Sequence, residues 1–306
     1  MTIFDAIILG LVEGITEYLP ISSTGHLIIT ANLLGLDRTV DDKEAIDAFN
    51  IVIQGGAILA VLGLFWPRVR SMIMGLLGRD RVGRRMAVNI IIAFLPAAIV
   101  GIMINDWVES QLFFAGPVIA ALFLGGVALL FLKGWQARLF HETDHDAAVS
   151  NEGETDDARP PSRFIAMEEL TWQRALIIGL LQCVAMWPGT SRSMMTIVGG
   201  MLVGMRPRDA AEFSFLLGLP TLGGACLYKG YKNLSGEGPN VFEVLGTAQV
   251  IVGILVALVA AALAVKWLVG YLKTHGMAAF GWYRIALAIV LLLLVWWGPV
   301  TISPVE

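Results

Sequence analysis

Two glutamates and a hydroxyl-rich turn near the start of the chain have the composition of a phosphate site. Residues 13–26 read Glu-Gly-Ile-Thr-Glu-Tyr-Leu-Pro-Ile-Ser-Ser-Thr-Gly-His. Glu13 and Glu17 are four residues apart, so a helix places both carboxylates on one face, one turn apart. Pro20 ends that helix because it lacks an amide proton. Two carboxylates can hold a hard divalent cation, and a helix that begins at the following hydroxyls offers free amides to a phosphate.

Hydroxyl residues and a histidine follow the proline. Ser22, Ser23 and Thr24 are residue types that begin a helix, and His26 falls in its first turn. Ser23 is a candidate nucleophile that loses its proton to Glu17 or His26. Alternatively, His26 attacks or activates a water molecule, with Ser23 as a ligand. The glutamates could instead be solvated at the membrane surface, but burial of a carboxylate at bilayer depth costs roughly 2.5–3.5 kcal/mol, which favours a functional role.

A second polar turn interrupts the apolar stretch 174–204, where residues 187–193 read Trp-Pro-Gly-Thr-Ser-Arg-Ser. Arg192 is the only arginine well inside an apolar region, and its planar fork suits a phosphate. A purely structural pairing of Arg192 with Glu13 or Glu17 is the alternative. The candidate substrate-binding residues are Arg192, Ser191, Thr24, Thr190, Ser193 and Thr196. Weaker candidates for lining the same pocket are Gln54 and Ser214.

The composition places these turns in a membrane protein. Of 306 residues, 57% are hydrophobic and 15% are charged, and the mean hydropathy is +0.73. Soluble domains carry roughly 25% charged residues. Six charge-poor windows have about the length of a membrane helix, namely 48–67, 86–105, 110–132, 213–228, 244–265 and 285–305. Cys183 and Cys226 lie in apolar runs and are interpreted as core residues, and nothing in the charge pattern favours a nucleic-acid partner.

The two interrupted segments, 3–36 and 174–204, predict pairs of half-length helices that enter the membrane and return. They resemble each other after a one-residue slip that aligns Pro20 with Pro188, although chance similarity is an alternative. We therefore expect an all-α polytopic membrane protein with six transmembrane helices and two re-entrant hairpins in an inverted-topology repeat. The expected parts are a first repeat at 1–140, an acidic cytoplasmic loop at 141–163 and a second repeat at 164–306.

The distribution of basic residues predicts the orientation, because cytoplasmic loops carry an excess of Lys and Arg. With both termini outside, the inner loops hold Arg68, Arg70, Arg79, Arg81, Arg84, Arg85, Lys133, Arg138, Arg159, Arg163, Arg174, Arg206, Arg208, Lys266, Lys273 and Arg284. The outer segments hold only Arg38, Lys43, Lys229 and Lys232. In this orientation the two polar turns meet within the membrane and open outward. Residues 164–172 are expected to form an amphipathic surface helix.

The two motifs, at 13–26 and 188–196, closely resemble those of the undecaprenyl-diphosphate phosphatase family of the bacitracin-resistance type, and the apolar pattern fits nearly the whole chain. Only the acidic insert at 142–163 departs from the compact members. The resemblance implies hydrolysis of undecaprenyl diphosphate to undecaprenyl phosphate and inorganic phosphate, which recycles the lipid carrier of peptidoglycan synthesis and confers bacitracin resistance. It also implies a homodimer in the bacterial inner membrane, a site facing the periplasm, and a divalent cation, Mg²⁺ or Ca²⁺, for which Glu13 and Glu17 are the candidate ligands.

A transporter is the rival interpretation. Inverted repeats whose broken helices meet at the membrane midplane are typical of carriers, so the same architecture could flip a polyprenyl phosphate. A carrier needs a binding arginine but does not need a dense cluster of serine, histidine and glutamate. The unrelated acid-phosphatase-like lipid phosphatases are set aside, because they use two histidines at separate motifs and only His26 lies at membrane depth.

Overall fold

The computed structural model describes residues 1–36, 40–149, 164–235 and 242–298. Apart from one isolated bridge between Ile165 and Met205, regular structure in these ranges is helical. Six described helices contain segments long and apolar enough to cross a membrane, which confirms the expected all-α class and the expected number of crossings. These segments are Ala45–Leu64, Arg81–Ile104, Ala115–Leu132, Pro207–Tyr228, Val244–Tyr271 and Ala278–Trp297.

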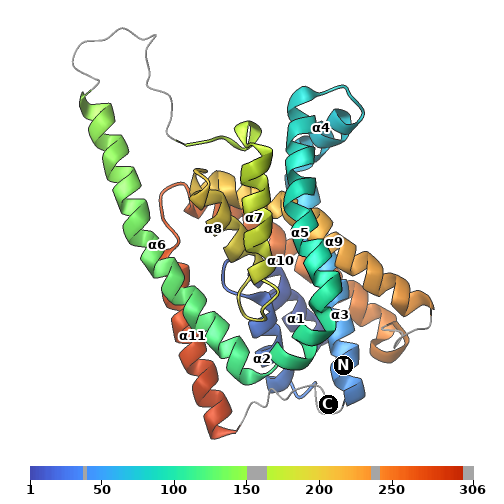
Figure 1. Ribbon diagram of the computed structural model, residues 1–306. Coiled ribbons are helices and arrows are strands. Elements are labelled where there is room, and N and C mark those ends of the chain that lie inside the picture. Colours follow the sequence, from blue (N-terminus) through green and yellow to red (C-terminus); the bar gives the residue numbers. More distant parts are fainter. Residues whose placement is uncertain (37–39, 150–163, 236–241, 299–306) are drawn as a thin grey trace.

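Figure 1 shows how the helices are arranged. In chain order they are α1 (Ile3–Thr16), α2 (Ser23–Leu33), α3 (Val40–Leu64), α4 (Trp66–Leu76), α5 (Arg81–Leu112), α6 (Ala115–Val149), the short η1 (Met167–Glu169), α7 (Trp172–Val184), α8 (Arg192–Leu202), α9 (Pro207–Ser235), the π-helical turn η2 (Phe242–Gly246), α10 (Thr247–Tyr271) and α11 (Ala278–Trp297). The pairs α1–α2 and α7–α8 lie at the centre, and α6 and α11 lie side by side (Figure 1).

The predicted boundaries of two spans and one predicted helix were wrong. The last span was expected at 285–305, but α11 begins at Ala278 and ends at Trp297, where Gly298 caps it in the left-handed conformation. The span expected from residue 110 begins later, because α5 continues to Leu112. No surface helix forms over 164–172, where the chain makes a bridge and a three-residue helical turn before α7 begins.

The four central helices are too short to cross a bilayer. They contain 14, 11, 13 and 11 residues, whereas a crossing needs about 20. Each pair forms a helix–turn–helix unit at one of the two expected hairpin segments, although α7 begins at Trp172, before the expected start at residue 174. Their placement relative to the membrane and the division of the chain into two repeats stay predictions, and most of the acidic loop lies outside the described residues.

Both units turn through the same unusual backbone conformation. Ser22 has φ 74° and caps the start of α2, and Ser191 has φ 76° and caps the start of α8. Among the described residues these are the only positive φ values outside glycine. Ser22 follows Glu13 by nine residues, and Ser191 follows Gln182 by the same number. In the structure, the two units therefore align from the glutamate or glutamine to the serine without a gap. The one-residue slip that aligned Pro20 with Pro188 is not needed.

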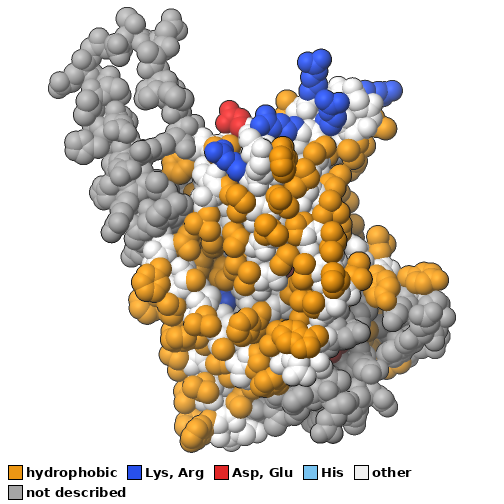
Figure 2. All heavy atoms as spheres, in the orientation of Figure 1, with side chains coloured by type: hydrophobic (Ala, Val, Ile, Leu, Met, Phe, Trp, Pro, Cys, Tyr) orange, Lys and Arg blue, Asp and Glu red, His pale blue; other side chains and the backbone are white. Residues whose placement is uncertain are grey.

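Glycines let the central helices approach their neighbours closely. A Cβ atom on Gly10 or Gly14 of α1 would lie 2.7 or 2.5 Å from a backbone carbonyl oxygen of α10. Likewise, a Cβ on Gly179 of α7 would lie 2.5 Å from the carbonyl oxygen of Ala93 in α5. Such contacts fix the central helices against long ones. Hydrophobic side chains cover much of the outside, and Lys and Arg side chains gather at the end that carries α4 (Figure 2).

Candidate active site

Helix α1 carries both candidate metal ligands toward the first turn. Thr2 and Asp5 form a capping box that begins the helix, and Glu13 and Glu17 then stand one turn apart, with the amide of Glu17 bonded to the Glu13 carbonyl at 3.0 Å. Because Gly14 packs directly against α10, the Glu13 side chain is buried, with 1% of its surface exposed. Glu17 is also buried. The sequence thus places two carboxylates inside the protein rather than at its surface.

One carboxylate joins the two turns. The hydroxyl of Ser23 donates to Oε2 of Glu17 at 2.7 Å, and Nη2 of Arg192 donates to Oε1 at 3.2 Å. The amide of Gln54 in α3 donates to Oε2 at 3.4 Å. Ser23 and Arg192 are each the first residue of the second helix in their unit, directly after the serine with positive φ. Residues separated by 175 positions therefore meet, as the sequence led us to expect.

Arg192 makes two further contacts that hold its guanidinium in place. Its Nη1 donates to the carbonyl oxygen of Ser214 at 3.1 Å, and its central carbon lies 5.7 Å from the ring centroid of Tyr18. The ion pair between Arg192 and Glu17 is the contact expected if Arg192 has a structural role. Arg192 also lies where an arginine that binds phosphate was expected. A guanidinium that is fixed by a carbonyl and a carboxylate is oriented before any anion arrives.

The remaining hydroxyl candidates fall into two groups. Ser193 is fully buried, and its hydroxyl donates to the carbonyl of Leu19 at 2.8 Å, which ties the second turn to the first. Thr196 is also buried and lies 2.6 Å from the hydroxyl of Ser214. The hydroxyl of Ser191 lies 3.0 Å from that of Ser193. In contrast, the side chains of two candidates near the turns, Thr24 and Thr190, have no hydrogen bond to any residue that the structure describes.

The two ring nitrogens of His26 are both engaged. Nδ1 lies 2.7 Å from the carbonyl oxygen of Ser22, and Nε2 lies 2.6 Å from the hydroxyl of Tyr283. A carbonyl oxygen only accepts hydrogen bonds, so Nδ1 carries a proton and Nε2 of the neutral ring accepts from Tyr283. Neither nitrogen contacts Ser23, whose hydroxyl is bonded to Glu17 instead. This geometry favours Glu17 over His26 as the group that takes the serine proton.

The comparison with protein families fits this arrangement. A family model described as "Bacitracin resistance protein BacA" matches residues 6–290. The chain belongs to the BacA family. A relative from Sorangium cellulosum (strain So ce56), named undecaprenyl-diphosphatase, is 41% identical over 94% of this chain and 85% of its own length. Relatives with the same name from Variovorax paradoxus (strain S110) and Cupriavidus metallidurans (strain ATCC 43123 / DSM 2839 / NBRC 102507 / CH34) are 39% and 41% identical, each over at least 96% of both chains.

Two residues of this BacA-family chain that contact the turns were missed by sequence reasoning. Tyr283 bonds His26, and the neighbouring Arg284 donates from Nη2 to the carbonyl oxygens of Gly189 and Ala121, at 2.9 and 3.0 Å. Arg284 had been assigned to an inner loop, which is wrong, because it lies in α11 with none of its surface exposed. The signal in the sequence is an arginine with apolar residues on both sides, and the span expected at 285–305 excluded it.

The donor set of this BacA-family site fits a divalent cation that also binds substrate. Oε1 of Glu13 is buried and has no hydrogen-bond partner among the described residues, whereas both oxygens of Glu17 are engaged. No group of three or more His, Cys, Asp or Glu side chains suited to a metal occurs in the described ranges. A cation at Glu13 and Glu17 would therefore complete its coordination with water and phosphate oxygens, as Mg²⁺ commonly does.

Proposed function

We propose that this chain hydrolyses undecaprenyl diphosphate to undecaprenyl phosphate and inorganic phosphate, and so returns the lipid carrier to peptidoglycan synthesis and confers bacitracin resistance. The observation that carries the proposal is the carboxylate of Glu17, which contacts a serine hydroxyl on one side and the partly buried guanidinium of Arg192 on the other. A nucleophile, its base and an anion-binding group thus lie within one hydrogen-bonded cluster. Membership of the BacA family and relatives named undecaprenyl-diphosphatase supply the substrate.

The contacts support Ser23 as the nucleophile. Glu17 takes the proton of the Ser23 hydroxyl, and the oxygen attacks the terminal phosphorus of the diphosphate. The bond from that phosphorus to the bridging oxygen breaks, so the lipid leaves as its monophosphate. Water then attacks the phosphoserine, giving inorganic phosphate and restoring the hydroxyl of Ser23. Attack by His26, or by a water molecule that His26 activates, is the alternative, and it requires His26 to leave Ser22 or Tyr283.

Arg192 and the helix starts would stabilise the charge that develops on the phosphate oxygens. The fork of Arg192 and the free amides at the starts of α2 and α8 form a positive surface around the cluster. Mg²⁺ or Ca²⁺ at Glu13 and Glu17 would neutralise the diphosphate. The expected substrate contacts at Thr24 and Thr190 belong to this surface, whereas Ser191, Ser193 and Thr196 would act by supporting it, because their hydroxyls are already bonded to protein groups.

The placement in the membrane is part of the proposal. We place α1–α2 and α7–α8 as re-entrant hairpins in the bacterial inner membrane, with the active site open to the periplasm. The short half-helices support this placement. So does the gathering of basic side chains at one end of the molecule (Figure 2). The homodimer rests on the family resemblance alone, and cysteine-specific crosslinking in native membranes tests it.

Rapid trapping of the reaction tests the nucleophile. The substrate is undecaprenyl diphosphate labelled at its terminal phosphate, and the reaction is stopped without acid. We expect label on Ser23 of the original chain and no label on the Ser23→Ala variant. Phosphohistidine, or an inactive Ser23→Ala variant in which His26 still carries label, would refute the serine mechanism. Phosphate release in detergent micelles should fall on addition of a chelator and return with Mg²⁺ or Ca²⁺.

Lipid movement is the second candidate function. The convergence of two short helix pairs at one cluster is the arrangement that carriers use around a substrate site. A Ser23→Ala/His26→Ala variant in vesicles separates the two functions. Movement of undecaprenyl phosphate by this variant would establish a carrier, whereas hydrolysis by the unaltered chain in micelles, where the two sides are not separated, establishes the enzyme.

A further inference from the structure

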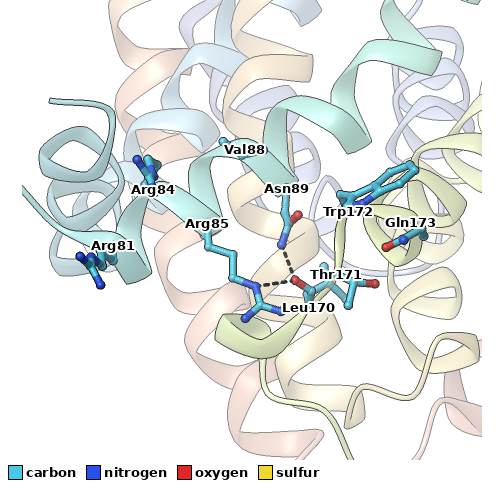
Figure 3. Close-up of a pocket in the computed structure, with 9 residues that line it drawn as sticks. All are labelled: Arg81, Arg84, Arg85, Val88, Asn89, Leu170, Thr171, Trp172 and Gln173. Carbon is cyan, nitrogen blue, oxygen red and sulfur yellow. Dashed lines mark hydrogen bonds between the residues drawn. The ribbon is translucent and has the colours of Figure 1, made fainter. Parts of the chain in front are cut away.

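A cavity with a basic rim lies away from the Glu17 cluster, between the start of α5 and the start of α7. Its volume is about 630 Å³, and its walls come from the first turns of α5 and from residues 170–173 (Figure 3). Three of the nine residues that line it are arginines, Arg81, Arg84 and Arg85, and none of the nine is acidic. The cavity therefore concentrates positive charge at one end of the membrane-spanning region.

One wall of this cavity is held rigidly by hydrogen bonds. The carbonyl oxygen of Leu170 accepts from Arg85 at 3.0 Å and from the amide of Asn89 at 2.7 Å (Figure 3). Arg85 also donates to the carbonyl oxygen of Glu169 at 2.7 Å. These bonds attach the start of α7 to α5, because three donors meet two successive carbonyls. The donors of Arg85 and Asn89 are thereby used within the protein, and the cavity is formed without a ligand.

The other two arginines are free to bind an anion. Arg81 and Arg84 are exposed, and neither has a hydrogen-bond or ion-pair partner among the described residues. The carboxylate of the nearby Glu168 is paired with Arg68, and that of Glu169 accepts from the amide of Ala166. Residues three apart on a helix lie on one face, so the two guanidinium groups can contact one phosphate.

An apolar stripe continues from these arginines along α5. Val88, Ile91 and Leu95 follow Arg84 by four, seven and eleven residues, so they lie on the same face of the helix, and all three are exposed. Trp172 stands on the opposite side of the cavity with an exposed indole, and tryptophan is enriched where the headgroups of a membrane begin (Figure 3). A phosphate at the arginines would thus sit directly above a surface that faces lipid chains.

We propose that this cavity binds the phosphate headgroup of an anionic phospholipid, with one acyl chain lying along the stripe formed by Val88, Ile91 and Leu95. Basic pockets between membrane helices are known to favour such headgroups. The inference is independent of the hydrolase reaction, because none of its residues belongs to the Glu17 cluster. Inorganic phosphate could use the same guanidinium groups but could not use the apolar stripe, and this difference separates the two ligands.

Native mass spectrometry of the full chain in an uncharged detergent tests the proposal. The chain is titrated with phosphatidylglycerol, with phosphatidylcholine of the same acyl chains, and with inorganic phosphate. We expect preferential binding of phosphatidylglycerol, and a loss of roughly tenfold to thirtyfold in its affinity in the Arg81→Gln/Arg84→Gln variant, because each basic side chain contributes about 1 kcal/mol. The charge-preserving Arg81→Lys/Arg84→Lys variant should bind nearly as the original chain does.

The matched control removes two exposed arginines that do not line the cavity. An Arg70→Gln/Arg79→Gln variant loses the same charge at the same end of the molecule, and we expect its affinity for phosphatidylglycerol to stay within about twofold. Equal losses in the two glutamine variants would overturn the proposal, since they would indicate a general attraction to anionic lipid. Equal binding of both lipids, or displacement of phosphatidylglycerol by millimolar inorganic phosphate, would also overturn it.

Discussion

A single methyl group added to Gly14 should displace the two buried carboxylates of the candidate site, Glu13 and Glu17. Gly14 lies between Glu13 and Glu17 on α1, and a Cβ atom there would be 2.5 Å from the carbonyl oxygen of Ala257 and 2.7 Å from the Cβ of Ala260. Ordinary contacts of this kind begin at 3.4 Å, so α1 would have to retreat from α10 by roughly 0.9 Å. The obstacle is helix backbone, which cannot rotate away as a side chain does.

The expected effect on the rate follows from that displacement. Misplacement of reacting groups by about 1 Å can cost on the order of a hundredfold in rate. Glu13 and Glu17 move with α1, whereas Arg192 and Gln54 are held by other helices, so the Gly14→Ala variant should lose about a hundredfold in kcat. Overpacking should also cost about 1–3 kcal/mol of stability. Phosphate release from saturating lipid diphosphate in micelles measures the rate, and the thermal midpoint measures the stability.

Gly63→Ala is the matched control. Gly63 is a helical glycine of α3, and a Cβ built on it meets nothing within 4 Å. This variant should keep its rate and gain about 0.5–1 kcal/mol of stability, because alanine is favoured over glycine in a helix. A Gly14→Ala protein with the original kcat and thermal midpoint would refute the argument that the contact between α1 and α10 positions the carboxylates.

Three further predictions concern single side chains. Arg192→Lys should lower kcat/KM about tenfold to a hundredfold, since one ammonium cannot replace the separate bonds to Glu17 and the Ser214 carbonyl, and full activity would contradict this. Ser193→Ala should lower the thermal midpoint by the equivalent of about 1–3 kcal/mol, because a buried carbonyl loses its donor, and an unchanged midpoint would contradict this. Hydrogen bonds from Ser71 and two backbone amides lower the pKa of Asp80, so its contribution to stability is present above about pH 4 and is lost as the pH falls through the lowered value. Asp80→Asn should therefore flatten the acid limb of a plot of thermal midpoint against pH, and an identical limb in both proteins would contradict this.

The membrane helices and the meeting of the two turns could be predicted because each has a strong energetic cause. Long charge-free windows can only be covered by lipid or protein, which fixes the number of crossings. An arginine at membrane depth needs an acceptor, and Glu13 and Glu17 were the carboxylates available to Arg192. Gln54, a weak candidate because it is a polar residue in the crossing that follows the first hairpin, donates to Glu17. Ser214 was also found, although its contact with Arg192 uses a backbone carbonyl that any residue type could supply.

The contribution of α11 could not be predicted from local pattern. His26 and Tyr283 are separated by 257 positions, and a tyrosine in an apolar helix is usually only a core or interface residue. Arg284 donates to two backbone carbonyls, and it has no acidic partner in the described part of the chain that could have marked it in the sequence. A buried arginine of this kind has the same sequence signature as an arginine at a helix end, which explains its wrong assignment to a loop.

The two turns differ in chemistry at the position where their backbones agree. Ser22 and Ser191 share a strained conformation that costs on the order of 1–3 kcal/mol each, and such strain persists only where the surrounding structure enforces it. The residue that follows is Ser23 in one unit and Arg192 in the other, and each contacts a different oxygen of Glu17. In the proposed mechanism, two arginines there would leave no nucleophile, and two serines would leave the diphosphate without a guanidinium. The difference between the two units is therefore what the proposed reaction requires, because one carboxylate contacts both the nucleophile and the anion-binding group.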